Sequence, residues 1–299
     1  MTGEGASSSV RQLIADASHR LGSTDPAVAR HEAEWLLAGL LHVRPVELYV
    51  DDVPISSQIA DTFHAGIAAR AGGQPLQYVV GAAEFFGRSF SVAPGVFIPR
   101  PETETIVQVM VDSLAIPRGQ PLRLLELGTG TGCIAITLAR QLPTCVVVAV
   151  ELSWKALWVA WNNAVRHQVV DRICWVQGSW CDAIQGQFDG LIANPPYIPS
   201  TRVDGLPLDV RQEPRVSLDG GPDGLDALLH IMTEASRLVR LGGPIVVECG
   251  EDQVAPLCAW ARHATWMETV RPIHDLAGRP RGVVMTAAPG AKISGPDGA

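Results

Sequence analysis

A possible binding site for a planar amide or amino group lies at Asn194-Pro195-Pro196-Tyr197. It follows an apolar segment, residues 188–193, that predicts a short buried strand. The prolines end this strand and stiffen the backbone, because a proline has no N–H for a sheet ladder. Asn194 and the Pro195 carbonyl supply hydrogen-bond acceptors, and Tyr197 supplies a flat ring. The alternative is a plain strand-ending turn, since Asn-Pro commonly begins turns.

A glycine loop upstream favours the binding site over the turn. Gly128-Thr129-Gly130-Thr131-Gly132 follows a predicted strand, so its backbone can approach a ligand closely and the next helix offers free N–H groups. The spacing is neither the Gly-x-Gly-x-x-Gly of dinucleotide sites nor a phosphate loop. Glu151 ends the second strand, where a carboxylate can accept both ribose hydroxyls of adenosine, although an acid there also suits a helix N-terminus. Together with residues 194–197, these features predict one pocket for a nucleoside and an acceptor substrate.

Strands and helices alternate from Pro121 onward, which predicts the frame that positions these residues. The alternation indicates an α/β fold with a Rossmann-like doubly wound sheet, mostly parallel, with an antiparallel strand near the C-terminus. In such sheets ligands bind outside the carboxyl ends of the strands, where the loop, Glu151 and Asn194 all fall. The predicted strands are 122–127, 146–150, 173–177, 191–193, 243–248, 268–273 and 281–287, and the helices are 133–142, 156–167, 225–241 and 253–263.

The pattern changes along the chain and predicts four segments. Residues 1–71 have helical apolar spacing and predict a small N-terminal helical domain that recognises a substrate. Residues 72–110 predict a β-hairpin connector, because apolar residues alternate through 86–92. Residues 111–288 form the predicted catalytic domain, and residues 289–299 predict a disordered tail.

The amino-acid composition disfavours several classes of function for this chain. The chain has 299 residues, a formal net charge of −8 and only two lysines, which disfavours broad nucleic-acid binding through phosphate neutralisation. Its six cysteines show no metal-ligand spacing and fit buried apolar positions in a reducing compartment, so we expect no metal site. No signal peptide or membrane-spanning apolar run is present, so we expect a soluble, cytoplasmic protein without membrane partners.

Several longer motifs resemble the HemK (PrmC) family of class I S-adenosylmethionine-dependent methyltransferases, and the resemblance covers about residues 10–288. The Asn-Pro-Pro-Tyr motif is shared with nucleic-acid methyltransferases, whereas the segments at 97–104 and 275–278 are more specific. The motifs are Gly73-Gln74-Pro75-Leu76-Gln77-Tyr78, Phe85-Phe86-Gly87, Phe97-Ile98-Pro99-Arg100-Pro101-Glu102-Thr103-Glu104, Glu126-Leu127 with the glycine loop, Asn194-Pro195-Pro196-Tyr197-Ile198, Glu213-Pro214, Gly220-Gly221-Pro222-Asp223-Gly224-Leu225 and Asp275-Leu276-Ala277-Gly278.

The resemblance implies that the protein uses S-adenosyl-L-methionine to methylate the side-chain amide of the glutamine in the Gly-Gly-Gln motif of peptide chain release factors. It implies that the glycine loop (Gly128, Thr129, Gly130, Thr131, Gly132) and Glu151 bind the cofactor, with Trp180 against the adenine. Asn194 is expected to bridge cofactor and substrate, and residues 194–197 to hold the amide, with Asn194 and Pro195 as the catalytic pair. Release factors are the implied partners, and no direct nucleic-acid partner is expected.

Three positions depart from the family pattern, and other functions remain open at this point. Glu151 stands where Asp is usual, Ser179 stands where Asp usually precedes Trp180, and Arg279-Pro280-Arg281 replaces an Arg/Asn-Asp-Arg sequence. The main alternative is an adenine or guanine amino methyltransferase, which could use the same motif on a flipped-out base. A non-catalytic cofactor sensor and a nicotinamide dehydrogenase are disfavoured by the intact motif and by the glycine spacing.

Overall fold

The fold was obtained as a computed structural model, and residue contacts divide the chain into two compact units. The described residues are 9–22, 25–50, 55–114 and 121–288. The predicted tail, residues 289–299, therefore lies outside the described residues. The first unit comprises residues 1–82, 92–94 and 207–212, and the second comprises residues 83–91, 95–206 and 213–299. The predicted connector is thus shared between the units.

The first unit is built on three helices that enclose a small apolar core. Each helix begins after a residue whose side chain accepts a hydrogen bond from the first turn: Ser9, Asp25 and Ser56. Phe63, Ile67 and Leu36 are fully buried among the helices. The helices are α1 (Val10–Leu21), α2 (Pro26–Leu41) and α3 (Ser57–Ala71), joined by a 3-10 helix at Pro45–Tyr49 and followed by the short α4 (Leu76–Val80). The sequence did not predict α4.

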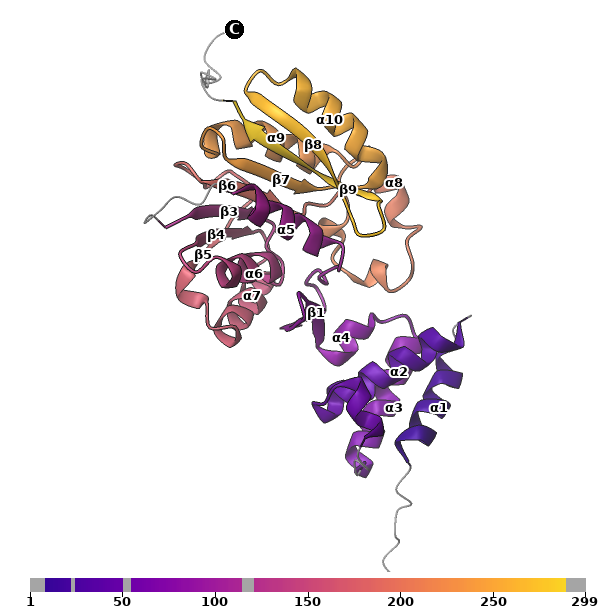
Figure 1. The fold of residues 1–299 in the computed structure, drawn as a ribbon. Helices are drawn as coiled ribbons and strands as arrows, with labels where there is room; N and C mark the ends of the chain where they lie inside the picture. The colour runs from indigo at the N-terminus through magenta and orange to yellow at the C-terminus, as the bar shows by residue number, and fades with distance from the viewer. Residues whose placement is uncertain (1–8, 23–24, 51–54, 115–120, 289–299) are drawn as a thin grey trace, which may run out of the picture. The chain divides into compact units, whose positions relative to one another are not determined.

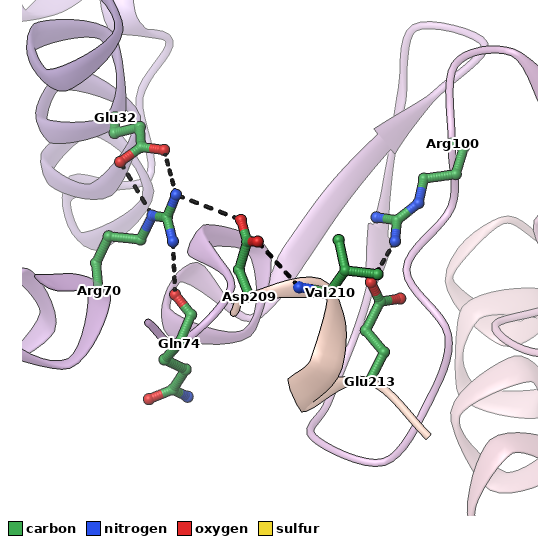
Figure 2. Close-up of polar contacts among 7 residues, drawn as sticks. All are labelled: Glu32, Arg70, Gln74, Arg100, Asp209, Val210 and Glu213. Carbon is green, nitrogen blue, oxygen red and sulfur yellow. Dashed lines mark hydrogen bonds and ion pairs between the residues drawn. The ribbon is translucent and has the colours of Figure 1, made fainter. Parts of the chain in front are cut away.

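A short segment from the second half of the chain, residues 207–212, packs within this first unit. The Arg70 guanidinium donates to both oxygens of Glu32, at 2.8 and 3.0 Å, and lies 3.5 Å from an Asp209 oxygen (Figure 2). Beside this pair, a methyl group on Gly73 would fall 2.2 Å from Leu208 Cδ2. A glycine at 73 therefore leaves the space in which the Leu208 side chain lies.

The second unit is organised around a seven-stranded sheet in which β3 to β7 run in parallel (Figure 1). Only β9 runs antiparallel to β7, and it pairs with β8 in a closing hairpin. The chain proceeds from β3 outward to β5 and then returns to the other side of β3 with β6, so the strand order reverses between β3 and β6. The strands in sheet order are β5 (Ile173–Gln177), β4 (Val146–Glu151), β3 (Arg123–Leu127), β6 (Gly190–Ala193), β7 (Pro244–Glu248), β9 (Pro280–Ala287) and β8 (Met267–His274).

Both faces of this sheet are covered by helices, so the side chains of its central strands are mostly buried and apolar, with the buried acids Glu126 and Glu248 as exceptions. Alternate side chains point to opposite faces: Leu124 joins one buried cluster, whereas Leu125 and Leu127 join the other. The first cluster includes residues of α5, α6 and α7, and the second includes residues of α9 and α10. The helices of this unit are α5 (Thr103–Ser113), α6 (Cys133–Gln141), α7 (Trp154–Arg166), the short α8 (Ser200–Val203), α9 (Asp226–Leu238) and α10 (Val254–His263), with short 3-10 helices at Val170–Arg172, Arg215–Ser217 and Glu251–Gln253. A further 3-10 helix, Val210–Gln212, belongs to the first unit.

A two-stranded hairpin of β1 (Ala82–Phe85) and β2 (Arg88–Ser91) precedes the sheet. Its turn residues, Phe86 and Gly87, have φ of 50° and 64°, as a tight two-residue hairpin turn requires. Glu104 Oε1 accepts the N–H of Phe86 at 2.7 Å, so this acid serves the hairpin. Asn163 exchanges two hydrogen bonds with Ser91, at 2.8 and 3.0 Å, and so ties the hairpin to α7.

The predicted doubly wound sheet, its parallel strands and its antiparallel strand near the C-terminus are confirmed. The element ends differ by a few residues. Helix α7 starts at Trp154 because the Ser153 hydroxyl accepts a hydrogen bond from Ala156 N, so the predicted start at 156 is wrong. Helix α9 ends at Leu238 rather than 241, because Val239 turns into extended backbone.

Candidate active site

The glycine loop joins β3 to α6 at the strand-order reversal. The N–H groups of Gly128 and Thr129 both donate to the Val150 carbonyl, at 2.9 and 3.1 Å, which fixes the loop over the end of β4. Gly128, Gly130 and Gly132 have φ between 55° and 80°, a region that favours glycine. At Gly132 a methyl group would also lie 3.0 Å from the Ala160 side chain. The third glycine therefore serves the packing of α6 on α7.

Glu151, the last residue of β4, reaches across to the same loop. One carboxylate oxygen accepts Gly130 N–H and the other accepts Ser153 N–H, each at 2.9 Å. The side chain thus holds the glycine loop and the start of α7 together. A carboxylate offers about four acceptor positions, so these two bonds leave acceptor capacity that faces the cavity.

Trp180 supplies an aromatic wall beside the loop. Its φ of 43° lies in the left-handed region, which is uncommon for a bulky residue and occurs where surrounding structure enforces it. The indole lies against Gly128, because a methyl group there would meet Trp180 Cζ3 at 3.5 Å.

Asn194-Pro195-Pro196-Tyr197 follows the last residue of β6. Asn194 Nδ2 donates to Thr103 Oγ1 at 3.1 Å. Pro195 is buried, and its carbonyl oxygen accepts no hydrogen bond from the described residues. The Tyr197 hydroxyl donates to Glu248 Oε1 at 3.4 Å, and burial raises the pKa of this hydroxyl, which keeps it a donor.

Two glycines and a glutamine support this segment from behind. A methyl group on Gly220 would fall 2.7 Å from the Pro196 oxygen, and one on Gly224 would fall 2.3 Å from the Tyr197 oxygen. Gln253 Nε2 donates to the same Tyr197 oxygen at 2.9 Å. The Gly-Gly-Pro-Asp-Gly sequence therefore allows backbone to pack directly against the motif.

One cavity of about 250 Å³ brings most of the predicted site residues together. Gly132, Pro195 and Tyr197 do not line it: Gly132 packs against Ala160 of α7, Pro195 is buried, and the Tyr197 hydroxyl donates to Glu248. Predicted residues that line it are Gly128, Thr129, Gly130, Thr131, Glu151, Trp180, Asn194 and Pro196.

Among the lining residues that were not predicted as site residues are Phe97, Arg100, Thr103, Pro214 and Val216. They come from the 97–104 and 213–217 segments. The unusual sequences of these segments were the signal that could have identified them as part of the site. The buried Glu213 carboxylate joins these segments, since it accepts a hydrogen bond from the Arg100 guanidinium (Figure 2). It accepts another from Ile98 N at 3.0 Å.

Two fully buried acids lie beneath the site. Burial raises the pKa of Glu126 to about 8, although its hydrogen bond from Thr129 at 2.7 Å opposes the shift. Burial likewise raises the pKa of Glu248, at the end of β7, to about 7. One oxygen of each carboxyl has no hydrogen-bond partner among the described residues.

Comparison with known proteins identifies the family. Residues 12–81 match the model of the PrmC N-terminal domain, and residues 88–205 match that of the methyltransferase small domain. The chain is 38% identical over 274 residues to the release factor glutamine methyltransferase of Moorella thermoacetica, covering 91% of this chain and 96% of that one. It is 42% identical over 229 residues to the enzyme of the same name from Geobacter sulfurreducens, covering 75% and 78%. The chain belongs to the release factor glutamine methyltransferase family.

Solved structures of more distant methyltransferases share the fold of this family member. The hMettl16 catalytic domain in complex with MAT2A 3′UTR hairpin 6 aligns with a TM-score of 0.55 at 17% identity, covering 76% of this chain and 84% of that one. A methyltransferase from Pyrococcus furiosus aligns at 0.50 with 17% identity, covering 75% and 96%. Identities this low support the fold alone.

The unusual Arg279-Pro280-Arg281 sequence preserves a well-defined turn in this family member. Asp275 accepts the N–H groups of Ala277 and Arg279, each at 2.9 Å, and the Arg281 guanidinium at 2.9 Å. Arg281 holds the pKa of Asp275 below its usual range and lies 3.6 Å from a Glu102 oxygen. The departure from the family pattern therefore keeps an arginine that connects this turn to the start of α5.

The described part of this family member contains no His, Cys, Asp and Glu grouping that could hold a metal ion. Its helices, taken over the same residues, are all too short or too polar to cross a bilayer.

Proposed function

We propose that this chain transfers a methyl group from S-adenosyl-L-methionine to the side-chain amide nitrogen of the glutamine in the Gly-Gly-Gln motif of peptide chain release factors. The observation that carries the proposal is the position of Asn194 and Pro196 in the same cavity as the glycine loop and Glu151. Relatives named release factor glutamine methyltransferase, similar over nearly the whole chain, supply the substrate class.

The residues of the cavity fit the proposed cofactor. The positive-φ glycines leave the loop backbone open to close approach, and the free acceptor positions of Glu151 suit a pair of ribose hydroxyls. Trp180 offers a flat apolar face for adenine. When bound, this cofactor supplies an electrophilic methyl group on a positively charged sulfur. The extra methylene of Glu151 relative to Asp is accommodated, since the carboxylate already reaches Gly130.

The Asn-Pro-Pro-Tyr motif supplies the acceptors for the substrate amide. Because Asn194 Nδ2 is engaged by Thr103, the opposite end of the carboxamide, Oδ1, is the atom left to accept an N–H. Pro195 itself does not line the cavity, but it lies between two residues that do, Asn194 and Pro196, and its carbonyl oxygen, which accepts no hydrogen bond from the described residues, is the proposed second acceptor. Two acceptors fix the nitrogen and favour the positive charge that develops on it, and positioning of this kind can supply ~7–11 kcal/mol of the barrier.

The proton that the nitrogen loses has no acceptor in the motif itself. Asparagine and proline cannot take up a proton, and Glu104 is engaged by the hairpin backbone. We propose that the proton leaves to water after methyl transfer.

The N-terminal helices are proposed to recognise the protein substrate. They match the PrmC N-terminal domain model, and none of the described residues that line the cavity belongs to them. Recognition of a folded release factor by a separate helical surface would leave the cavity free for the glutamine alone.

Mass spectrometry of a release factor after incubation with the enzyme and S-adenosyl-L-methionine tests this function. We expect one added methyl group on the Gly-Gly-Gln glutamine. Asn194→Ala should abolish it, whereas Asn162→Ala, on the exposed side of α7, should not. Labelled methyl groups found in ribosomal RNA or DNA and absent from the release factor would contradict the proposal.

A further inference from the structure

A stripe of exposed apolar side chains runs along α7. Its members are Trp154, Trp158, Trp161 and Val165, which are 66, 57, 40 and 44% exposed. Apolar side chains that are exposed singly are common on proteins, whereas a contiguous apolar patch marks a surface that binds something. Tryptophan is also enriched at the centres of protein–protein interfaces. None of these residues lines the cavity of the candidate site, so the proposed chemistry does not account for them.

This tryptophan stripe is continuous, because its indoles pack together beside a hollow. The rings of Trp158 and Trp161 are stacked, with centroids 5.5 Å apart and planes 15° apart. The hollow next to them has a volume of about 230 Å³. All three indoles of the stripe line it, together with Leu157 and with Trp175 and Gln177 of β5, the edge strand of the sheet. The face therefore combines projecting flat rings with an apolar hollow beside them.

The spacing of the stripe is that of a helix–helix seam. Its four members follow one another at intervals of four, three and four residues, which is the a/d spacing by which one helix packs on another. The buried face of α7 is a separate one that includes Ala156, Ala160 and Ala164. Helix α7 thus carries a second apolar stripe, and no helix among the described residues covers it.

A second copy of this chain has the chemistry that the stripe requires. A two-fold axis between Trp158 and Trp161 presents the same stripe to itself, with the two α7 helices antiparallel. Antiparallel helices place the positive end of each dipole beside the negative end of the other.

The charges of α7 lie off the stripe, so no charge has to be buried in such a contact. The helix has no acidic residue, and its two cations are Lys155 and Arg166. Arg166 donates to Ser91 of the hairpin at 2.9 Å. Lys155 lies toward Gly95, where a methyl group would fall 3.5 Å from its Nζ.

The area of the stripe fits a weak, reversible contact. A tryptophan side chain covers ~150–250 Å². From the exposed fractions of the three indoles, each copy can bury roughly 250–400 Å² of indole surface, and two copies bury roughly 500–800 Å². Val165 adds to this total. Transient protein–protein contacts bury less than roughly 1,200 Å², and we expect a dissociation constant on the order of micromolar.

We propose that the tryptophan stripe of α7 is a self-association surface that joins two copies of this chain in a reversible dimer. The two α7 helices pack antiparallel across the axis, and the indoles of each copy cover the hollow of the other. The proposal does not depend on the proposed function, since it involves neither the cofactor cavity nor the substrate amide.

Sedimentation of the full chain over concentrations that span this dissociation constant tests the proposal. Wild type should pass from monomer to dimer. Trp158→Glu, which puts a charge at the centre of the stripe, should weaken dimerisation at least about 100-fold, because an unpaired charge would be buried twice. Trp158→Phe keeps a flat ring and should retain most of it. Leu241→Glu, at an apolar residue that is 54% exposed outside the stripe, is the matched control and should dimerise as wild type does.

A second variant and a fluorescence measurement make the test independent of the folding of Trp158→Glu. Trp154→Glu should also weaken dimerisation, and an acid at the first position of α7 favours the helix. Tryptophan emission of wild type should move to shorter wavelength as the protein concentration rises, because the stripe leaves water, and both glutamate variants should lack this change. Urea unfolding of each variant at low concentration checks its fold.

Three results would overturn the proposal. The first is a wild-type protein that stays monomeric at every concentration. The second is a dimer that the folded Trp158→Glu and Trp154→Glu variants form as tightly as wild type. The third is a monomeric wild type whose affinity for a release factor falls in Trp158→Glu, which would assign the stripe to the protein substrate.

Discussion

Replacing Glu126 with glutamine should flatten the pH dependence of the protein's stability. In the folded protein the pKa of Glu126 is raised from 4.5 to about 8, because the carboxyl is fully buried. The folded state therefore keeps a proton that the unfolded chain releases above pH 4.5. This bound proton contributes fully to the free energy of unfolding below pH 4.5, the pKa of the carboxyl in the unfolded chain. The contribution is lost as the pH rises through about 8, the pKa in the folded protein.

The size of the stability change follows from the difference between the folded and unfolded pKa values of Glu126. Each pH unit between 4.5 and about 8 should remove ~1.4 kcal/mol from the free energy of unfolding, which amounts to roughly 5 kcal/mol over the whole range. Glutamine is neutral at every pH, so the variant lacks this slope. Its stability relative to wild type should increase steadily as pH rises from 5 to 8.

Urea unfolding of both proteins at intervals between pH 5 and pH 9 measures the difference. Other groups titrate equally in both proteins and cancel in the comparison. Glu234→Gln, in a half-exposed pair with Arg237, is the matched control and should follow wild type. Parallel curves for wild type and Glu126→Gln would refute the account of a neutral buried acid beneath the glycine loop.

Two further substitutions probe the loop and the motif. Gly224→Ala should abolish activity and lower the free energy of unfolding by several kcal/mol, because its methyl group would fall 2.3 Å from the Tyr197 oxygen. The control is Gly242→Ala, at a similar φ of 76° but with open space around it. In chemical denaturation it should lower the free energy of unfolding by only about 1 kcal/mol. Glu151→Gln should weaken cofactor binding, measured by calorimetry, at least about tenfold, because a neutral amide replaces a charged hydrogen-bond acceptor. Equal cofactor affinities of this variant and wild type would contradict the assignment of Glu151 to the ribose.

The sequence predicted the sheet well because its signals are local. The segments at 122–127 and 146–150, the second of them a continuous apolar run, were predicted as parallel strands covered on both faces, and the structure has them at Arg123–Leu127 and Val146–Glu151. The glycine loop and Asn194 follow strands β3 and β6, and the cavity contains both. Chain order and strand ends were therefore enough to predict which segments meet.

The supporting contacts could not be predicted because they join residues far apart in the chain. Thr103 accepts a hydrogen bond from Asn194, which lies 91 positions away in the sequence. Glu213 accepts one from Ile98, which lies 115 positions away. Glu126 and Glu248 were visible as acids within apolar strands, yet their protonation depends on burial that only the packed sheet provides. No spacing rule indicates such partners in a single sequence.

In the proposed reaction, Asn194 orients a glutamine side-chain amide for methyl transfer. The most direct measurement is the single-turnover rate of methylation of a release factor by wild type and Asn194→Ala, with cofactor affinity and unfolding measured on the same samples. We expect a variant that is folded and binds cofactor yet adds no methyl group to the Gly-Gly-Gln glutamine. Methylation of that glutamine at the wild-type rate by Asn194→Ala would contradict it.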